Sequence, residues 1–130
     1  MTSGEMTELS GFTAASKMLD AADAPTAFLA SSMLSGMGIR RAIEGRGLAM
    51  GRDISLIIFD DDLSYLRNGT DVPIFTATRS SVREAGKIAA EMLLHRIANP
   101  DSPPEHRLLE AELIIGQSTG PVPVSPRAKV

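Results

Sequence analysis

The hydrophobic residues of this chain follow two patterns, one with helical spacing and one in short continuous runs. Apolar positions three or four residues apart predict a helix through Phe12 and Leu19 that ends before Pro25. The same kind of spacing predicts two further helices, over Met33–Arg46 and Val82–Ala98. The chain is therefore expected to contain three helices, separated by segments of a different character.

Serine and glycine residues mark the ends of the second and third predicted helices. Ser32 directly precedes Met33, where its hydroxyl can accept a hydrogen bond from the first turn of the helix. Ser81 and Glu84 have the spacing of a capping box. Gly47 follows the second helix, at a position where glycine commonly ends helices.

The short apolar runs predict strands. These runs are Thr26–Ala30, Ile54–Phe59, Val72–Arg79 and Leu108–Ile115. The run from Ile54 is almost continuously apolar, which favours a strand covered on both faces, as in a parallel sheet between helices. In the last run Glu110 and Glu112 share one face, which indicates an edge or antiparallel strand. The order strand, helix, strand predicts an α/β fold, a parallel sheet flanked by helices.

Three carboxylates, Asp60 to Asp62, end the second predicted strand abruptly. In open α/β sheets, ligands bind just outside the carboxyl ends of the strands. Carboxylates there can accept hydrogen bonds from ligand hydroxyls, hold Mg²⁺ or carry a phosphoryl group, although aspartate also favours turns and helix starts. The metal and phosphoryl roles would require a lysine near another strand end and a second acidic cluster, and the sequence offers neither.

Composition restricts the function further. The 130 residues suit one domain, and a net charge of −3 argues against a nucleic-acid-binding surface. The absence of cysteine excludes disulfides, zinc-thiolate sites and a thiol nucleophile. His95 and His106 lack metal-ligand spacing, and no Gly-x-Ser-x-Gly elbow surrounds Ser31. We therefore expect no enzyme activity and no cofactor.

No run reaches transmembrane length and no export signal begins the chain, so we expect a cytoplasmic protein without membrane contact.

From about Gly4 to Pro121 the sequence resembles the C-terminal part of LacI/GalR-type bacterial transcription regulators. The matching segments are Pro25–Ala30, Met37-Gly38 together with Ala42–Gly47, Asp53–Asp61 with its Phe-Asp-Asp motif, Pro73–Thr78, Gly86 with Ala89-Ala90 and Leu93-Leu94, and Glu112–Thr119. Six such pieces occur in the family's order, so the likeness covers nearly the whole chain.

The resemblance implies a partial periplasmic-binding-protein-like fold, mainly the C-terminal lobe, truncated at its N-terminus. Residues 1–121 would form a partial effector-binding and dimerisation domain, of which about 79–98 belong to the other lobe in the family layout. Residues 122–130 would be a disordered tail. DNA would be bound only through a headpiece that this chain lacks. The third helix would then expose Ile88, Leu93 and Ile97, which favours association over a stable monomer.

The resemblance also assigns residues to a small sugar-like effector. Asp60, the first aspartate of Phe-Asp-Asp, would contact it. Ser31 stands where the family has an asparagine, Ser80 falls at a cleft-lining position, and Met6 stands where an aromatic ring often stacks on the effector. A serine lacks the two-point hydrogen bond of an amide and methionine lacks a ring face, so two alternatives are open: the effector differs from an ordinary sugar, or effector binding is lost.

A homodimer or higher oligomer is expected, because partner subunits in the family meet through this lobe. The resemblance places the interface at Met33, Met37, Arg40 and Arg41, with part of the 63–71 loop. Two alternatives remain open from the sequence. One is a fragment of a periplasmic sugar-binding transport protein, whose lobes are alike. The other is an Mg²⁺-dependent enzyme or phospho-acceptor domain that uses Asp60 to Asp62.

Overall fold

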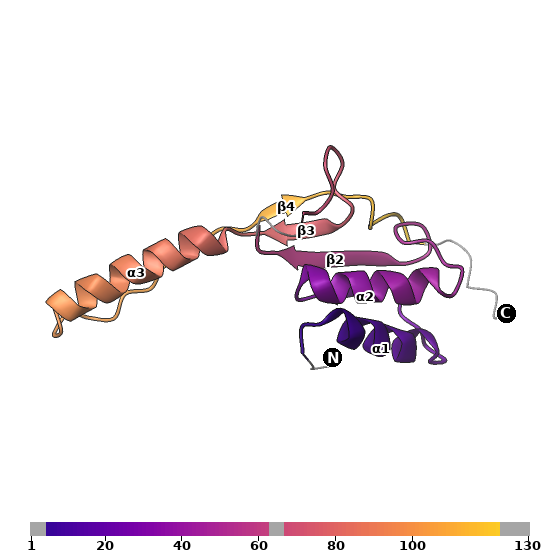
Figure 1. Cartoon of the computed structure of the whole chain (residues 1–130), viewed down its shortest axis with the longest axis horizontal. Helices are drawn as coiled ribbons and strands as arrows, with labels where there is room; N and C mark the ends of the chain where they lie inside the picture. Colours follow the sequence, from indigo (N-terminus) through magenta and orange to yellow (C-terminus); the bar gives the residue numbers. More distant parts are fainter. Residues whose placement is uncertain (1–4, 63–66, 123–130) are drawn as a thin grey trace.

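The computed structural model of the chain describes residues 5–62 and 67–122 and contains seven elements (Figure 1). In chain order they are α1 (Glu8–Leu19), β1 (Ala27–Ala30), α2 (Met33–Glu44), β2 (Ser55–Asp60), β3 (Thr76–Arg79), α3 (Val82–Ala98) and β4 (Glu112–Ile114). The α/β class predicted from the sequence is confirmed. None of the described helices is long and apolar enough to cross a membrane.

The four strands form one sheet in the order β1-β2-β3-β4. β1, β2 and β3 are parallel, and β4 pairs with β3 in the antiparallel direction, as the one wet face of the last apolar run predicted. The carboxyl ends of the three parallel strands therefore lie at the same edge of the sheet, where β4 begins. We call this edge the carboxyl edge.

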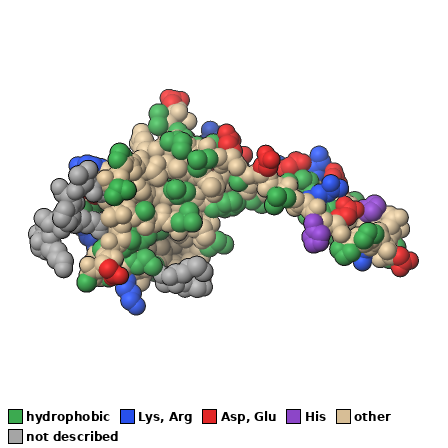
Figure 2. Space-filling model, turned by 180° about the vertical axis from the view of Figure 1, so that it is seen from behind, with side chains coloured by type: hydrophobic (Ala, Val, Ile, Leu, Met, Phe, Trp, Pro, Cys, Tyr) green, Lys and Arg blue, Asp and Glu red, His purple; other side chains and the backbone are tan. Residues whose placement is uncertain are grey.

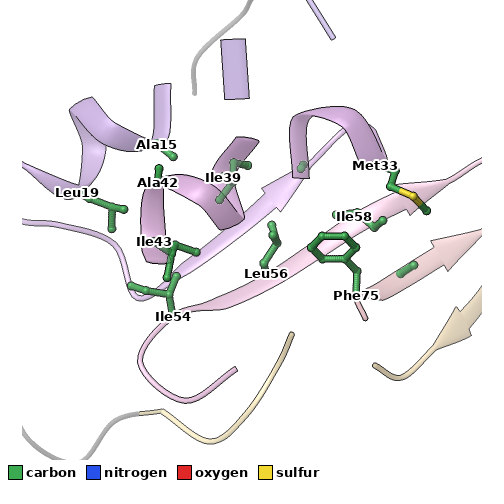
Figure 3. Close-up of a cluster of buried hydrophobic side chains, with 12 residues drawn as sticks. Ala15, Leu19, Met33, Ile39, Ala42, Ile43, Ile54, Leu56, Ile58 and Phe75 are labelled. Atoms are coloured by element: carbon green, nitrogen blue, oxygen red, sulfur yellow. The ribbon is translucent and has the colours of Figure 1, made fainter. Parts of the chain in front are cut away.

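Helices α1 and α2 cover one face of the sheet, with α2 next to it (Figure 1). The hydrophobic core lies between α2 and this face and includes Ile43, Leu56, Ile58 and Phe75 (Figure 3). Burial alternates along β2: Leu56 and Ile58 are buried, whereas Phe59 on the opposite face is exposed. The expectation that helices cover both faces of this strand is therefore not met within the part of the chain that the structure describes.

The N-terminal caps of α2 and α3 lie where the sequence predicted them, whereas α2 ends at Glu44 with Gly45 as its C-cap, two residues before the predicted end at Arg46. The side chain of Ser32 accepts a hydrogen bond from the backbone N–H of Ser35, and Ser81 accepts one from Glu84. Gly47 follows α2 with a φ of +69°, a conformation that costs glycine little and other residues more. The first helix begins at Glu8, where Thr7 caps it in the same way.

The third helix extends away from the sheet as an arm (Figure 1). Not one α3 residue is fully buried, and Leu93, Leu94 and Ile97 are each at least 60% exposed. Hydrophobic and charged side chains are mixed along this arm (Figure 2). The assignment of residues 79–98 to another lobe stays a prediction, and the predicted tail lies mostly outside the described residues.

Candidate functional site

Charged and hydroxyl side chains gather at the carboxyl edge of the sheet. The register pairs Asp60 of β2 with Arg79 of β3, and Arg79 with Glu112 of β4. Ser31 directly follows the last residue of β1, and Ser80 the last residue of β3. The fold therefore brings three of the four predicted effector-binding residues to the edge where ligands of such sheets bind.

Asp60 is only 3% exposed, and contacts hold its side chain from two directions. Its Oδ2 accepts hydrogen bonds from Arg79 Nε at 3.1 Å and Arg79 Nη2 at 2.8 Å. Its Oδ1 accepts one from the backbone N–H of Asp62 at 3.1 Å. The backbone N–H of Ser80 donates to the Asp60 carbonyl at 3.3 Å. These contacts fix the carboxylate in one orientation, and within residues 5–62 and 67–122 they are three hydrogen bonds for about four lone-pair directions.

Arg79 is the cation that balances this carboxylate, and sequence reasoning did not identify it. Its pKa is raised above the ordinary value, chiefly because its side chain donates hydrogen bonds to Asp60, with smaller contributions from the charges of Asp60, Asp62 and Glu112. About a third of its side chain, 32%, is exposed. Its position at the end of the predicted strand that contains Pro73 could have indicated a residue at the carboxyl edge. The identity of its partner, however, depends on the strand register.

Ser31 opens onto a hollow of about 330 Å³ between α1, β1 and α2. The lining includes Glu5, Gly11, Leu29 and Ser35. Asp60, Ser80 and Met6 do not contribute to it, so the hollow does not unite the predicted effector-binding residues. The neighbouring Ser32 is engaged in capping α2, which leaves the exposed Ser31 as the serine available to a ligand.

Met6 lies in the segment just before α1, and 61% of the residue is exposed. Its neighbour Glu5 lines the same hollow as Ser31, so this segment lies near the end of β1. Ser80 is half-buried beside Asp60. The roles of these residues stay predictions, because their position alone does not identify a ligand.

The four predicted interface residues differ in what they leave for a partner. Met33 is only 8% exposed and packs in the core, which argues against a large contact with another subunit (Figure 3). Met37 is 41% exposed.

The two arginines of α2 already have intramolecular partners. Arg40 pairs with Glu44 at 2.7 Å. Arg41 pairs with Glu8 at 3.4 Å and lies 4.3 Å from the centroid of the Phe12 ring. Both side chains remain partly exposed, so a partner could still reach them. Residues 63–66 of the predicted interface loop lie outside the described part of the chain.

The alternative of a metal centre gains no geometric support. Among residues 5–62 and 67–122, no three histidine or carboxylate side chains come together as a candidate metal site. Of the three aspartates, Asp60 is paired with Arg79 rather than with other carboxylates. His95 lies 3.0 Å from Glu105 on the exposed arm, far along the chain from the carboxyl edge.

Comparison with known proteins identifies a family. The sequence model of the family described as "Periplasmic binding protein-like domain" matches residues 2–119. The HTH-type transcriptional regulator AglR of Rhizobium meliloti is 44% identical over 119 residues, which are 91% of this chain and 33% of AglR. The chain thus spans about a third of the length of this relative.

Solved structures agree with the sequence comparison. The structure of a dimeric Lac repressor with an 11-residue C-terminal deletion is similar with a TM-score of 0.74 and 28% identity, over 92% of this chain and 42% of the other. A LacI family regulator from Enterococcus faecium with bound ribose gives a TM-score of 0.69 at 25% identity, over 89% and 41%. These relatives are transcriptional regulators and not enzymes.

Proposed function

Because this chain belongs to the periplasmic binding protein-like domain family and its relatives are LacI-type transcriptional regulators, we propose that it senses a small sugar-like effector and contributes to dimerisation. The effector binds at the carboxyl edge of the sheet, in the cytoplasm. DNA is contacted by a headpiece that lies outside this chain. The alternatives of a transport protein and an Mg²⁺-dependent enzyme are set aside, because the relatives described above are regulators.

The observation that carries the proposal is the buried, fixed carboxylate of Asp60 at the carboxyl edge. A carboxylate held in one orientation accepts hydrogen bonds from ligand hydroxyls with little loss of side-chain entropy. The hydroxyls of Ser31 and Ser80 follow neighbouring strands at the same edge. Such a mixture of one charged acceptor and neutral hydroxyls suits a ligand rich in hydroxyl groups.

The relatives support a sugar-like ligand. The Enterococcus regulator of similar fold was solved with bound ribose. In this chain the carboxylates of Asp62 and Glu112 add negative charge near Asp60 and Arg79. A neutral polyol is therefore a better candidate than a strongly anionic ligand, which those carboxylates would repel. Met6 would contact the apolar face of the ring.

We assign dimerisation to the exposed part of α2 around Met37, Arg40 and Arg41. A dimeric Lac repressor is among the proteins of similar fold. An apolar side chain beside arginines is a composition enriched at the cores of protein interfaces. Met33 contributes to this surface only indirectly, by packing α2 against the sheet.

A thermal-shift screen with neutral sugars tests the effector-binding role. A sugar that binds the folded chain raises its melting temperature. We expect this shift to be lost in Asp60→Asn, whose side chain cannot replace the carboxylate. Asp23→Asn is the matched control, because Asp23 is exposed and precedes β1 at the opposite edge of the sheet. Equal shifts in the wild type and in Asp60→Asn would refute the role of Asp60.

A further inference from the structure

We propose that Arg79 is the positioning residue of this effector site, which orients the Asp60 carboxylate so that Oδ1 faces the ligand. The inference rests on the proposed function, because Arg79 acts through Asp60 and not on the effector itself. It assigns to the third strand a role in specificity that the resemblance to LacI/GalR-type regulators did not suggest.

The division of contacts between the two carboxylate oxygens leads to this inference. Both nitrogens of Arg79 that contact Asp60, Nε and Nη2, donate to the same oxygen, Oδ2. The other oxygen, Oδ1, receives the backbone N–H of Asp62 at 3.1 Å. An ionised carboxylate has about four lone-pair directions, so Oδ1 keeps capacity for one further donor. Among the described residues, Arg79 therefore accounts for the contacts at Oδ2, and the Asp62 N–H accounts for the contact at Oδ1.

The register of the sheet makes this geometry rigid. Asp60 and Arg79 lie directly opposite each other at the ends of β2 and β3. The Ser80 N–H donates to the Asp60 carbonyl and extends the pairing by one residue. On the far side of β3, Glu112 lies opposite Arg79, and its charge also favours the guanidinium. Arg79 is thus hydrogen-bonded to Asp60 on one neighbouring strand and lies opposite Glu112 on the other.

The guanidinium is better suited to this task than an ammonium group. Its planar fork can direct two N–H groups to one side of a carboxylate, whereas the single nitrogen of lysine is a compact charge that can approach from several directions. Arg79→Lys therefore preserves the charge balance of the buried Asp60 but relaxes its orientation. A change in ligand selectivity without loss of folding is the expected signature of a positioning residue.

The test measures how well the protein discriminates between a sugar and its deoxy analogues. Affinities of D-ribose, D-glucose and D-galactose and their monodeoxy forms are measured by calorimetry for the wild type and for Arg79→Lys. In the wild type, removal of the hydroxyl that contacts Asp60 should weaken binding roughly tenfold to hundredfold, the usual range for a hydrogen bond to a charged group. In Arg79→Lys this penalty should fall to about threefold or less.

The control is Arg52→Lys, which makes the same replacement in an exposed pair with Asp53, in the turn before β2 at the opposite edge of the sheet, and should leave the discrimination unchanged. Thermal melting of each variant shows whether it is folded. If a sugar binds and Arg79→Lys retains the wild-type penalty for the deoxy analogue, Arg79 has no positioning role although the proposed function stands. If none of the three sugars binds the folded wild type, both proposals fall.

Discussion

Ser118 illustrates how single buried polar residues complete this sheet. It is fully buried, and its hydroxyl accepts a hydrogen bond from the Thr76 N–H at 2.7 Å and donates to the Leu56 carbonyl. β2 and β3 pair only from Ile57 and Thr76 onward, so the serine bridges the strands where their direct pairing has not yet begun. No pattern in the sequence indicated this role, because Ser118 lies in a turn-like segment 42 residues after its nearer partner.

We predict that Ser118→Ala lowers the free energy of unfolding by about 1–3 kcal/mol, because it leaves a buried N–H and a buried carbonyl without a partner. Denaturant unfolding followed by circular dichroism measures the change. Thr70→Ala, at an exposed position, should have an effect below about 0.5 kcal/mol. An equal loss in both variants would contradict the bridging role.

Helices α1 and α2 lie unusually close together at two glycines. A Cβ on Gly38 would lie 1.9 Å from the Glu8 carbonyl oxygen, and one on Gly11 would lie 2.2 Å from the Ser35 carbonyl oxygen. Both positions have only backbone as neighbours, which cannot move aside easily. The glycines therefore set the distance between the helices. The cost is the lower helix propensity of glycine.

Gly38→Ala should consequently destabilise the chain by about 1–3 kcal/mol, the usual cost of overpacking. Gly86→Ala is the matched control, because Gly86 is also inside a helix but has no atom within 4 Å of an added Cβ. That control should stabilise its helix by about 0.5–1 kcal/mol. Thermal unfolding of the two variants should therefore shift in opposite directions, and a shared direction would refute this view of the helix contact.

At the level of elements, the sequence predicted the helices better than the strands. α3 matches its prediction from Val82 to Ala98, because its start is marked by a serine cap. The third strand is shorter than predicted, since the Asn68 side chain, not a neighbouring strand, pairs with the backbone of Phe75. The last strand is limited to Glu112–Ile114, because β3 offers only a short partner.

The residues of the candidate site also differ in how well the sequence predicted them. Asp60 could be placed from the sequence, since an apolar run that ends in aspartates locates the end of a buried strand. Arg79 could not be identified as its partner, because cross-strand pairing depends on a register that two short strands do not encode locally. The resemblance to known regulators indicated Ser31, Ser80 and Met6, whereas their surroundings required the structure.

The whole molecule combines a compact sheet-and-helix body with an exposed arm. Leu93, Leu94 and Ile97 expose at least 60% of their surface on α3. Burial of a large aliphatic side chain contributes roughly 1.5–3 kcal/mol, so a surface of this kind favours association. This geometry accords with the expectation that the chain does not persist as a stable monomer.

We predict that sedimentation velocity detects dimers or larger species whose proportion rises with protein concentration. The triple variant Leu93→Gln, Leu94→Gln and Ile97→Gln should shift the distribution toward the monomer. Glu84→Gln, on the first turn of the same helix, serves as the control and should leave the distribution unchanged. A wild-type chain that sediments as a monomer at every concentration would contradict this account of the arm.

The central claim is that the carboxyl edge of the sheet binds the effector. Amide resonances of isotopically labelled protein, followed during titration with a sugar that raises the melting temperature, test it most directly. We predict the largest shifts at Ser31, at Asp60 to Asp62 and at Ser80. Shifts confined to the opposite edge, around residues 47–53, with none at the carboxyl edge, would contradict it.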